Sequence, residues 1–389
     1  MSPLNNYLVS PSCAHASEAF YPLRAMVCRE CRLVQCVHEL AANEIFRPDY
    51  VYFSSHSTSW LKHADRYVDT VIRRFNLDRA SRIIEVASND GYLLQFAQAR
   101  GLNVLGIEPC ESVALAARTK GIQTLIEFFG TKLAHELAER SQTADLLIAN
   151  NVLAHVPDLT DFINGIATLL APEGVATFEI QHLLRLMQRQ QFDTIYHEHY
   201  SYLSLLAANR IFASAGLRVF DVESLSTHGG SIRFFVCHKG ASHEESEHVA
   251  ATTREERNYG LDNDRIYTNW SEAVRESKRT LLSLLIELKR EGKTIVGYGA
   301  PSKAVTLLNY CGVGRDFIDF TVDLAPSKIG QLLPGVRIPI HHPDALMEAR
   351  PDYILILPWN IKDEIKEQLA AAREWGAKFI VPIPTARIE

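Results

Sequence analysis

The sequence predicts an α/β protein with two Rossmann-like domains, each a mostly parallel sheet covered by helices, and a small N-terminal lobe. Short apolar strands alternate with segments of helical period in two separate stretches, which is typical of βαβ units. A glycine-bearing turn follows the first strand of each stretch, at residues 85–91 and 297–303. The length of 389 residues is enough for two domains with an attachment.

The expected elements follow one another in this order. After a cysteine-bearing start, residues 55–76 predict a helix that opens with SSHSTS. The first set contains the strands RIIEVA, NVLGIE, ADLLIAN and GVATFEI with helices between them, then LRVFDVE and SIRFFVCH. A charged helical stretch follows, and the second set runs through KTIVGYGAPSK, FIDFTVD, YILILP and KFIVPI. We therefore expect a lobe at 1–54, a core at 55–240, a helical connector at 241–291 and a C-terminal domain at 292–389.

Composition and charge exclude several classes of protein. The net charge of −6 gives no basic surface for nucleic acid or an anionic membrane, so we expect neither as a partner. The longest apolar runs have the length of strands, which is too short to span a bilayer. The start, MSPLNNYLVSPSCAHA, has neither a basic n-region nor an apolar h-region, which indicates a cytoplasmic protein. Seven cysteines fit reduced thiols or a metal remnant better than a disulfide framework.

The first glycine turn, EVASNDG, favours a cationic ligand over a dinucleotide. A dinucleotide site needs several glycines so that the backbone can approach a pyrophosphate, and here only Gly91 is present. Glu85 and Asp90 bring carboxylates that repel a diphosphate and attract a sulfonium. Glu108, at the end of the next strand, is positioned to accept hydrogen bonds from ribose hydroxyls. The pattern predicts S-adenosylmethionine, with the expected contacts Glu85, Ala87, Ser88, Asn89, Gly91 and Glu108.

The loop ANNVLAHVPDL follows the ADLLIAN strand and leads into a helix. The pattern resembles class I methyltransferases, in which this loop lies against the cofactor. Asn150 and Asn151 would then hold the amino-acid portion of the cofactor. For His155 and Asp158 we favour ordinary structural roles, namely a hydrogen bond within the loop and a helix N-cap.

The stretch FDTIYHEHYSYLS gathers three tyrosines, two histidines, a glutamate and an aspartate in thirteen residues. Methyl transfer to carbon needs a carbanion equivalent, which a base can form by removing a proton α to a carbonyl. Histidine has a suitable pKa for that base, and tyrosine can donate to the oxyanion. In an extended segment, His197 and His199 would share one face. A metal site on these two histidines, or a hydrogen-bonded turn between domains, are the alternatives.

With these motifs the sequence resembles the NDP-sugar C-methyltransferases of deoxysugar pathways. The resemblance covers nearly the whole chain and is carried by YVYFSS, EVASNDGYLLQF, VLGIEP, ANNVLAHVPDL, FDTIYHEHYSYLS, THGGSIR, GYGAPSKAVTLLNY, LLPGVRIPI and ILPWN. It implies S-adenosylmethionine-dependent methylation of C3 in a 4-keto-6-deoxyhexose nucleotide, usually linked to dTDP. It also implies a zinc-binding N-terminal lobe, a methyltransferase core and a C-terminal domain, with the sugar nucleotide between the last two.

The resemblance assigns roles to residues of the YHEH and YVYFSS motifs. His199 would be the base that removes the C3 proton, and Tyr196 and Glu198 would hold the sugar oxygens and the forming enolate. Either Tyr50 or Tyr52 would reach the same site.

The N-terminal lobe departs from the family pattern. The family has two CxxC pairs, because tetrahedral zinc prefers four thiolates. Only the pair Cys28 and Cys31 is present, and Cys13, Cys36 and His38 lack regular spacing. Half a ligand set binds zinc poorly, so we regard a metal at Cys28 and Cys31 as doubtful: either the lobe works without zinc or the start of the chain has been lost.

The second glycine turn, GYGAPSK, together with Asp323 motivates an alternative function, that of an NAD(P)-dependent oxidoreductase acting on a sugar nucleotide. The turn lacks a third glycine, and a simple packing turn is a further possibility. The family resemblance instead implies a substrate-binding domain, in which Lys303 would suit the substrate diphosphate. A third reading is a sugar-nucleotide-binding protein without turnover. The expected substrate contacts are His228, Gly229, Ser231, Arg233, Tyr298, Gly299, Ala300 and Lys303.

Overall fold

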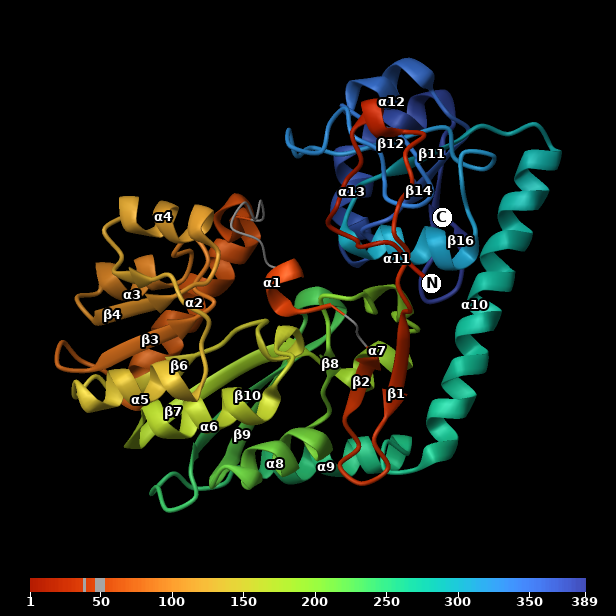
Figure 1. The fold of residues 1–389 in the computed structure, drawn as a ribbon. Helices are drawn as coiled ribbons and strands as arrows, with labels where there is room; N and C mark the ends of the chain where they lie inside the picture. The colour runs from red at the N-terminus through yellow and green to blue at the C-terminus, as the bar shows by residue number, and fades with distance from the viewer. Residues whose placement is uncertain (38–39, 46–52) are drawn as a thin grey trace.

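The computed structural model describes residues 1–37, 40–45 and 53–389, and three sheets organise them. Figure 1 shows a large sheet with its helices on one side of the molecule and a second α/β body on the other, with both chain termini beside the second. The α/β class predicted from the sequence is confirmed, and the expected strands and connector helices are present.

The larger sheet has seven strands in the order β5-β4-β3-β6-β7-β10-β9. β10 is antiparallel to both of its neighbours, and the other pairs are parallel. Because β4 and β6 flank β3, the strand order reverses there, and ligands of such sheets bind beyond the carboxyl ends at this point. The strands are β3 (Arg82–Val86), β4 (Asn103–Ile107), β5 (Thr124–Leu125), β6 (Ala144–Ile148), β7 (Leu170–Gln181), β9 (Leu217–Leu225) and β10 (Ser231–His238).

Helices cover both faces of this sheet. Ile83 and Ile84 are consecutive in β3 and fully buried in two different apolar clusters, because successive side chains of a strand point to opposite faces. The first helix begins inside SSHSTS, where the Ser57 side chain accepts the N–H of Trp60. The helices are α2 (Thr58–Phe75), α3 (Leu94–Ala99), α4 (Glu111–Thr119), α5 (Thr131–Glu139), α6 (Leu159–Leu169), α7 (Leu183–Gln188) and α8 (Leu205–Ser214).

The C-terminal body has a six-stranded sheet in the order β13-β12-β11-β14-β15-β16, and only its edge strand β16 is antiparallel. The GYGAPSK turn leaves β11 where the strand order reverses, between β12 and β14. The elements are β11 (Ile295–Tyr298), α11 (Ser302–Cys311), β12 (Thr321–Val322), β13 (Ile340–His341), α12 (Asp344–Ala349), β14 (Tyr353–Ile356), α13 (Lys362–Gln368), β15 (Lys378–Val381) and β16 (Arg387–Ile388).

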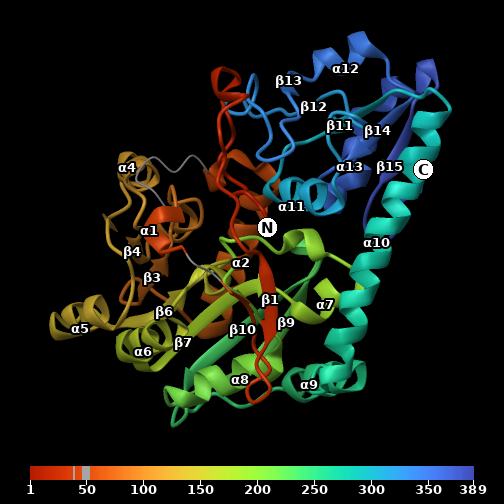
Figure 2. The ribbon, with the colours of Figure 1, turned by 45° about the vertical axis from the view of Figure 1, so that its right-hand side comes forward.

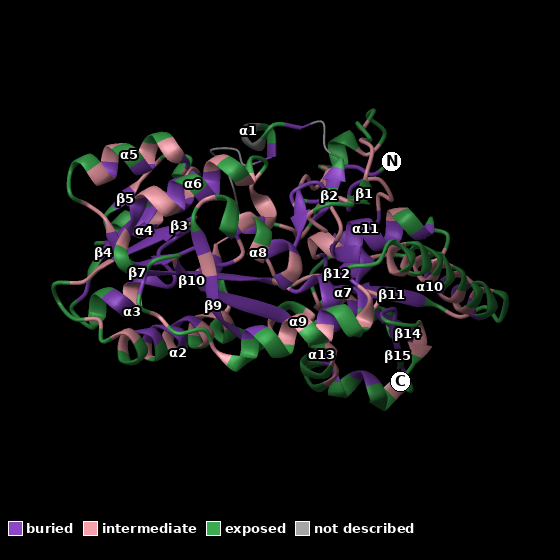
Figure 3. Ribbon diagram, turned by 90° about the horizontal axis from the view of Figure 1, so that it is seen from below, coloured by how far each residue is buried: buried purple, intermediate pink, exposed green. Residues whose placement is uncertain are grey.

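Two helices connect the bodies, α9 (Glu247–Tyr259) and α10 (Asp264–Arg290). Figure 2 shows α10 along the side of the molecule, from α9 up to the C-terminal body. Leu281, Leu285 and Leu288 recur at helical spacing and are buried in the apolar cluster of that body. The outward face of α10 is mostly exposed, whereas the strands are buried (Figure 3). None of the described helices is long and apolar enough to cross a bilayer.

The N-terminal lobe reaches both bodies. Its hairpin, β1 (Arg24–Val27) and β2 (Val34–Val37), forms a small antiparallel sheet with β8 (Ser201–Tyr202), and the short helix α1 (Ala42–Ile45) follows. The preceding strap, residues 1–21, pairs Val9 with Leu332 of the C-terminal body. The strap and the hairpin therefore bracket the YHEH segment, which ends immediately before β8.

Candidate active site

The turn after β3 is tight and depends on glycine. Ala87, Asn89 and Gly91 all have positive φ angles, of 53°, 50° and 74°. A Cβ atom on Gly91 would lie 2.3 Å from Cδ1 of Ile122, so no larger residue fits without displacement. The turn carries the backbone across the carboxyl end of β3, at the position expected for the cofactor.

Three buried polar atoms at this edge have no hydrogen-bond partner among the described residues: Glu85 Oε2, Ser88 Oγ and Asn150 Oδ1. Buried polar atoms without partners are rare and indicate a missing ligand or water. Burial raises the pKa of Glu85 well above its usual value, and a cation at this edge would favour the ionised carboxylate. The unpartnered acceptors therefore fit S-adenosylmethionine, which carries a sulfonium and an ammonium group.

The carboxylate groups of Glu108 and Asp90 both have partners within the protein, which the sequence does not predict. The two Glu108 oxygens accept the backbone N–H groups of Asn89 at 3.0 Å and Cys110 at 2.8 Å. These bonds orient the buried carboxylate and leave it lone pairs for ribose hydroxyls. The Asp90 carboxylate instead accepts the N–H of Ser55 and pairs with Lys120 at 3.2 Å, so it is engaged by other parts of the chain.

Asn151 continues this edge from the end of β6. It has a φ of 56°, and its N–H donates to the carbonyl oxygen of Glu179 at 2.6 Å. Nearby, Asp158 caps α6 by accepting the N–H of Asp161, as the sequence predicts. The hydrogen bond of His155 is not within the loop as expected: its Nδ1 donates to the Glu198 carbonyl oxygen of the YHEH motif at 2.6 Å.

His199 has the geometry of a neutral base. Its Nδ1 lies 3.0 Å from the carbonyl oxygen of Thr194, which can only accept, so the proton is on Nδ1 and the lone pair on Nε2. The ring is half-buried and packs on Tyr196 at 4.1 Å and on His155 at 4.7 Å between centroids. Burial, followed by the charge of His155, lowers the pKa of His199 well below its usual value, which keeps the imidazole neutral at pH 7.

The expectation that the YHEH segment is extended is wrong. It begins with a 3-10 turn at Phe192–Thr194 and continues through irregular turns before β8. His197 consequently does not share a face with His199: its Nε2 donates to the carbonyl oxygen of Pro22 at 3.2 Å, and its ring meets Tyr21. The two histidines therefore serve different parts of the molecule, and within the described ranges no cluster of His, Cys, Asp or Glu could hold a metal ion.

Glu198 is turned toward the N-terminal strap. Glu198 as a whole is only 4% exposed, and its carboxyl group is hydrogen-bonded to both the backbone and the side chain of Asn6. Burial raises the pKa of Glu198 to about 8, so the acid is mostly protonated at pH 7. Asn6 also accepts a hydrogen bond from the Ser302 hydroxyl, which ties the strap to the GYGAPSK turn.

The C-terminal body contributes Lys303, which the sequence predicts as a contact, together with Thr306, Trp359 and Asn360, which it does not. Trp359 Nε1 donates to Oδ2 of the fully buried Asp193 at 2.6 Å. Lys303 Nζ lies 4.5 Å from the centre of the Trp359 ring and donates to Asn360 Oδ1 at 2.6 Å. Thr306 of the same body donates to the carbonyl oxygen of Ile195 at 3.0 Å. The segment around YHEH is thus held directly by the C-terminal body.

The THGGSIR motif lies between these two groups. A Cβ atom on Gly229 would lie 2.6 Å from Gln191 Nε2 and 3.1 Å from Trp359 Cη2, so glycine permits their close approach. His228 has a φ of 51°, and its exposed ring contacts Trp60 at 5.2 Å. Ser231 Oγ donates to the carbonyl oxygen of Thr227, within the motif.

Arg233 is engaged within the protein, whereas the sequence predicts that it meets a ligand. It pairs with the fully buried Glu179 at 2.6 Å and with Glu223 at 2.6 Å. Glu179 also binds His63 at 2.7 Å and Thr227 at 2.8 Å. Burial would raise the pKa of Glu179, but the hydrogen bond from His63 and the charge of Arg233 lower it to about 2. This network of ion pairs and hydrogen bonds holds the THGGSIR motif in place.

In the GYGAPSK turn, most predicted contacts have partners within the body. The Ala300 N–H donates to Asp323 Oδ2 at 2.7 Å, and Tyr298 donates to Gln368 at 3.0 Å. Gly299 has a φ of 87° and lies against Pro358, where a Cβ atom would come within 2.6 Å of Cδ. Lys303 of this turn lies over Trp359, which in turn binds Asp193 just before the YHEH motif.

Two predictions concern the N-terminal lobe. Tyr50 and Tyr52, like His38, lie outside the described residues. Cys28 and Cys31 are half-buried at the hairpin turn, where they hydrogen-bond each other, and Cys36 is buried against Tyr202.

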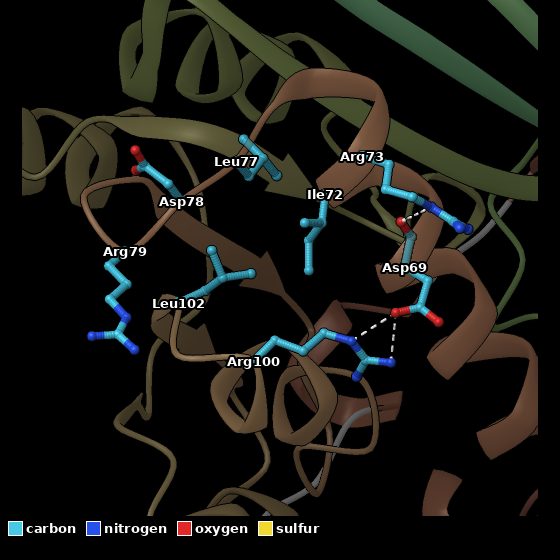
Figure 4. A pocket seen from close by; sticks show the side chains of 8 residues that line it. All are labelled: Asp69, Ile72, Arg73, Leu77, Asp78, Arg79, Arg100 and Leu102. Atoms are coloured by element: carbon cyan, nitrogen blue, oxygen red, sulfur yellow. Dashed lines mark hydrogen bonds and ion pairs between the residues drawn. The ribbon is translucent and has the colours of Figure 1, made fainter.

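A pocket of about 360 Å³ lies away from all of these residues (Figure 4). It opens between α2 and the loops that enter β3 and β4, at the amino ends of these strands and so at the opposite edge of the sheet. Arg100 in its wall is paired with Asp65 and Asp69. The pocket contains none of the predicted site residues.

Comparison with known proteins places three family models along the chain. A methyltransferase domain matches residues 60–222, a C-methyltransferase C-terminal domain matches residues 226–384, and a model named for zinc binding matches residues 1–46. The chain is 36% identical over 387 residues to the C-methyltransferase NovU of Streptomyces niveus, covering 100% of this chain and 92% of the relative.

More distant likenesses cover only part of this chain. The ubiquinone biosynthesis O-methyltransferase of Bartonella tribocorum is 24% identical over 28% of this chain and 47% of its own length. The structure of magnesium protoporphyrin IX methyltransferase from Synechocystis, with bound SAH, has a TM-score of 0.36 and 16% identity, covering 50% of this chain and 91% of that one. A likeness at this TM-score carries no weight for the function.

Proposed function

Because this chain belongs to the C-methyltransferase family of which NovU is a member, we propose that it methylates C3 of a nucleotide-linked 4-keto-6-deoxysugar by base-catalysed enolisation. The chain is an S-adenosylmethionine-dependent methyltransferase, and the sugar, the position and the mechanism are the proposal. The observation that carries it is His199, a neutral imidazole with its lone pair on Nε2, held where both bodies and the strap meet.

The proposed chemistry assigns one proton to His199. Nε2 removes the hydrogen of C3 as a proton, and the electron pair of that bond moves into an enolate with the C4 oxygen. The lone pair is available because the Thr194 carbonyl oxygen fixes the proton on Nδ1. Tyr196, whose ring packs at a tilt on the His199 ring, is suited to hold an oxygen of the sugar or of the enolate.

Bound S-adenosylmethionine supplies an electrophilic methyl group on a positively charged sulfur. Glu85, Ser88, Asn150 and Glu108 would hold the cofactor at the carboxyl edge of the large sheet. When the enolate carbon forms its bond to the methyl group, the bond from that group to sulfur breaks and the C4 ketone is restored. The products are the methylated sugar nucleotide, S-adenosylhomocysteine and one proton, and alignment of the two reactants supplies much of the rate.

The sugar-nucleotide class is supported by the motifs that this sequence shares with the deoxysugar C-methyltransferases, YHEH and THGGS above all. Both motifs border one site: Gly229 lies against Trp359, and Asp193 just before YHEH binds the same tryptophan. The oxidoreductase alternative receives no support from the matched families. Asp323, which a dinucleotide reading assigns to a ribose, accepts the Ala300 N–H and pairs with Lys328 at 3.3 Å.

The test is incubation with S-adenosylmethionine and a panel of 4-keto-6-deoxysugar nucleotides, on dTDP and on UDP, with product masses recorded. We expect one panel member to gain the mass of one methyl group, and NMR to locate it on C3. A methyl group on oxygen or on another carbon, or no product from any member, would refute the proposal.

A further inference from the structure

Lys303 holds a position at the catalytic segment that suits a ketone better than a diphosphate. It is the second residue of α11, and the helix start directs its side chain toward Trp359 and Asn360. An ammonium over an aromatic face is attracted by the ring quadrupole, so Trp359 fixes the charge in place. The lysine is half-buried, which leaves part of its side chain open to a ligand.

The contacts of Trp359 connect Lys303 to the base. Trp359 donates to Asp193 at 2.6 Å, and Asp193 precedes Thr194, whose carbonyl oxygen orients His199 at 3.0 Å. The other side of the tryptophan meets Gly229 of THGGSIR. One aromatic ring therefore contacts both the lysine and the segment that carries the histidine, which come from different bodies.

Asp193 helps to keep Lys303 charged. The aspartate is fully buried, and its Oδ1 has no hydrogen-bond partner among the described residues. Burial raises the pKa of Asp193 to about 6, although the charge of Lys303 lowers it. The carboxyl group is therefore ionised at pH 7. Burial lowers the pKa of Lys303, and the Asp193 charge counteracts this. The same lysine charge also lowers the pKa of His199 and His228, so it acts on the base itself.

We propose that Lys303 is a catalytic residue that binds the C4 ketone oxygen and stabilises the negative charge it gains when C3 is deprotonated. The inference rests on the proposed function. C4 is bonded directly to C3, so a base on the C3 hydrogen and a cation on the C4 oxygen must be neighbours, each at about 3 Å from its target. The diphosphate is attached to C1, which lies opposite C4 in the six-membered ring. Lys303, which Trp359 links to the segment that carries His199, is therefore assigned to the ketone.

The experiment separates these two roles with Lys303→Met and Lys303→Gln. Two quantities are measured: hydrogen exchange at C3 in deuterated water with saturating sugar nucleotide, and the Kd of dTDP or UDP, which carry the diphosphate but no ketone. We expect exchange to fall about 100-fold or more in both variants, as when one oxyanion donor is removed. The Kd of the nucleoside diphosphate should change less than twofold.

Lys278→Met is the matched control. Lys278 lies on α10, with its ammonium 5.3 Å from the centre of the Tyr310 ring and donating to the carbonyl oxygen of Tyr310. This variant should keep wild-type exchange. Unchanged S-adenosylmethionine binding establishes that each variant is folded. If Lys303→Met does not fold, the comparison is made with Lys303→Gln alone. Normal exchange at saturation combined with a weakened nucleoside diphosphate Kd would overturn the inference and assign Lys303 to the diphosphate. A wild-type protein without exchange or methyl transfer would refute the proposed function itself.

Discussion

Replacing Glu198 with glutamine should make the protein less sensitive to alkaline pH. In the folded chain burial raises the pKa of Glu198 to about 8, whereas an unfolded glutamate titrates near 4.3. The folded state therefore holds a proton that the unfolded state has lost, so stability from this group is complete below about pH 4 and falls as pH rises toward 8. Glutamine is close in shape to the protonated acid and does not titrate.

The size of the effect follows from the gap between the two pKa values. Each pH unit between them costs about 1.4 kcal/mol of unfolding free energy, with less lost near pH 8, where the folded group is half ionised. From pH 6 to pH 8 the wild type should lose about 2 kcal/mol more stability than Glu198→Gln.

The assay is urea denaturation of the wild type and the variant at pH 6, 7 and 8, with the difference in unfolding free energy compared across pH. Glu245→Gln, at an exposed glutamate, is the control and should parallel the wild type. A difference between wild type and Glu198→Gln that stays constant from pH 6 to pH 8 would refute the reasoning. It would mean that Glu198 is ionised in the folded protein and is free to act as a base.

Three further predictions concern the site and its support. His199→Asn should abolish both C3 hydrogen exchange and methyl transfer while calorimetry shows unchanged S-adenosylmethionine binding; activity near that of the exposed-site control His135→Asn would place the base elsewhere. Glu179→Ala leaves Arg233 buried without its main partner and should cost about 3–5 kcal/mol in urea denaturation, and a loss below about 1 kcal/mol would contradict the buried pair. Gly229→Ala should lower kcat at least tenfold, because its Cβ would displace Gln191 and press on Trp359, and a positive φ costs about 1–2 kcal/mol; wild-type kcat would contradict that close packing.

The sequence predicts the two sheets well because their strands are buried on both faces and carry continuous apolar runs. YILILP is such a run, RIIEVA is one apart from Arg82 and Glu85, and both form strands inside their sheets. The hairpin at Arg24–Val27 and Val34–Val37 was not predicted, because much of it is exposed and its pattern is weak.

The candidate site was predicted by residue type but not by arrangement. His199 and the cofactor turn are recognisable from local motifs. The course of the YHEH segment depends on partners far away in the sequence, since Asn6, Thr306 and Trp359 all bind it, and Trp359 lies 166 residues from Asp193. No local period encodes such contacts. The THGGSIR motif predicts a ligand for Arg233, whereas its buried partner Glu179 lies opposite it on another strand, where no local pattern reveals it.

Hydrogen exchange at C3 of the sugar nucleotide, followed by NMR in deuterated water with S-adenosylhomocysteine in place of the methyl donor, tests the central claim most directly. If an imidazole forms an enolate before the methyl group moves, wild-type protein will place deuterium at C3 and His199→Asn will not. Equal incorporation by both proteins, or methyl transfer by a wild type that never exchanges this hydrogen, would contradict the account.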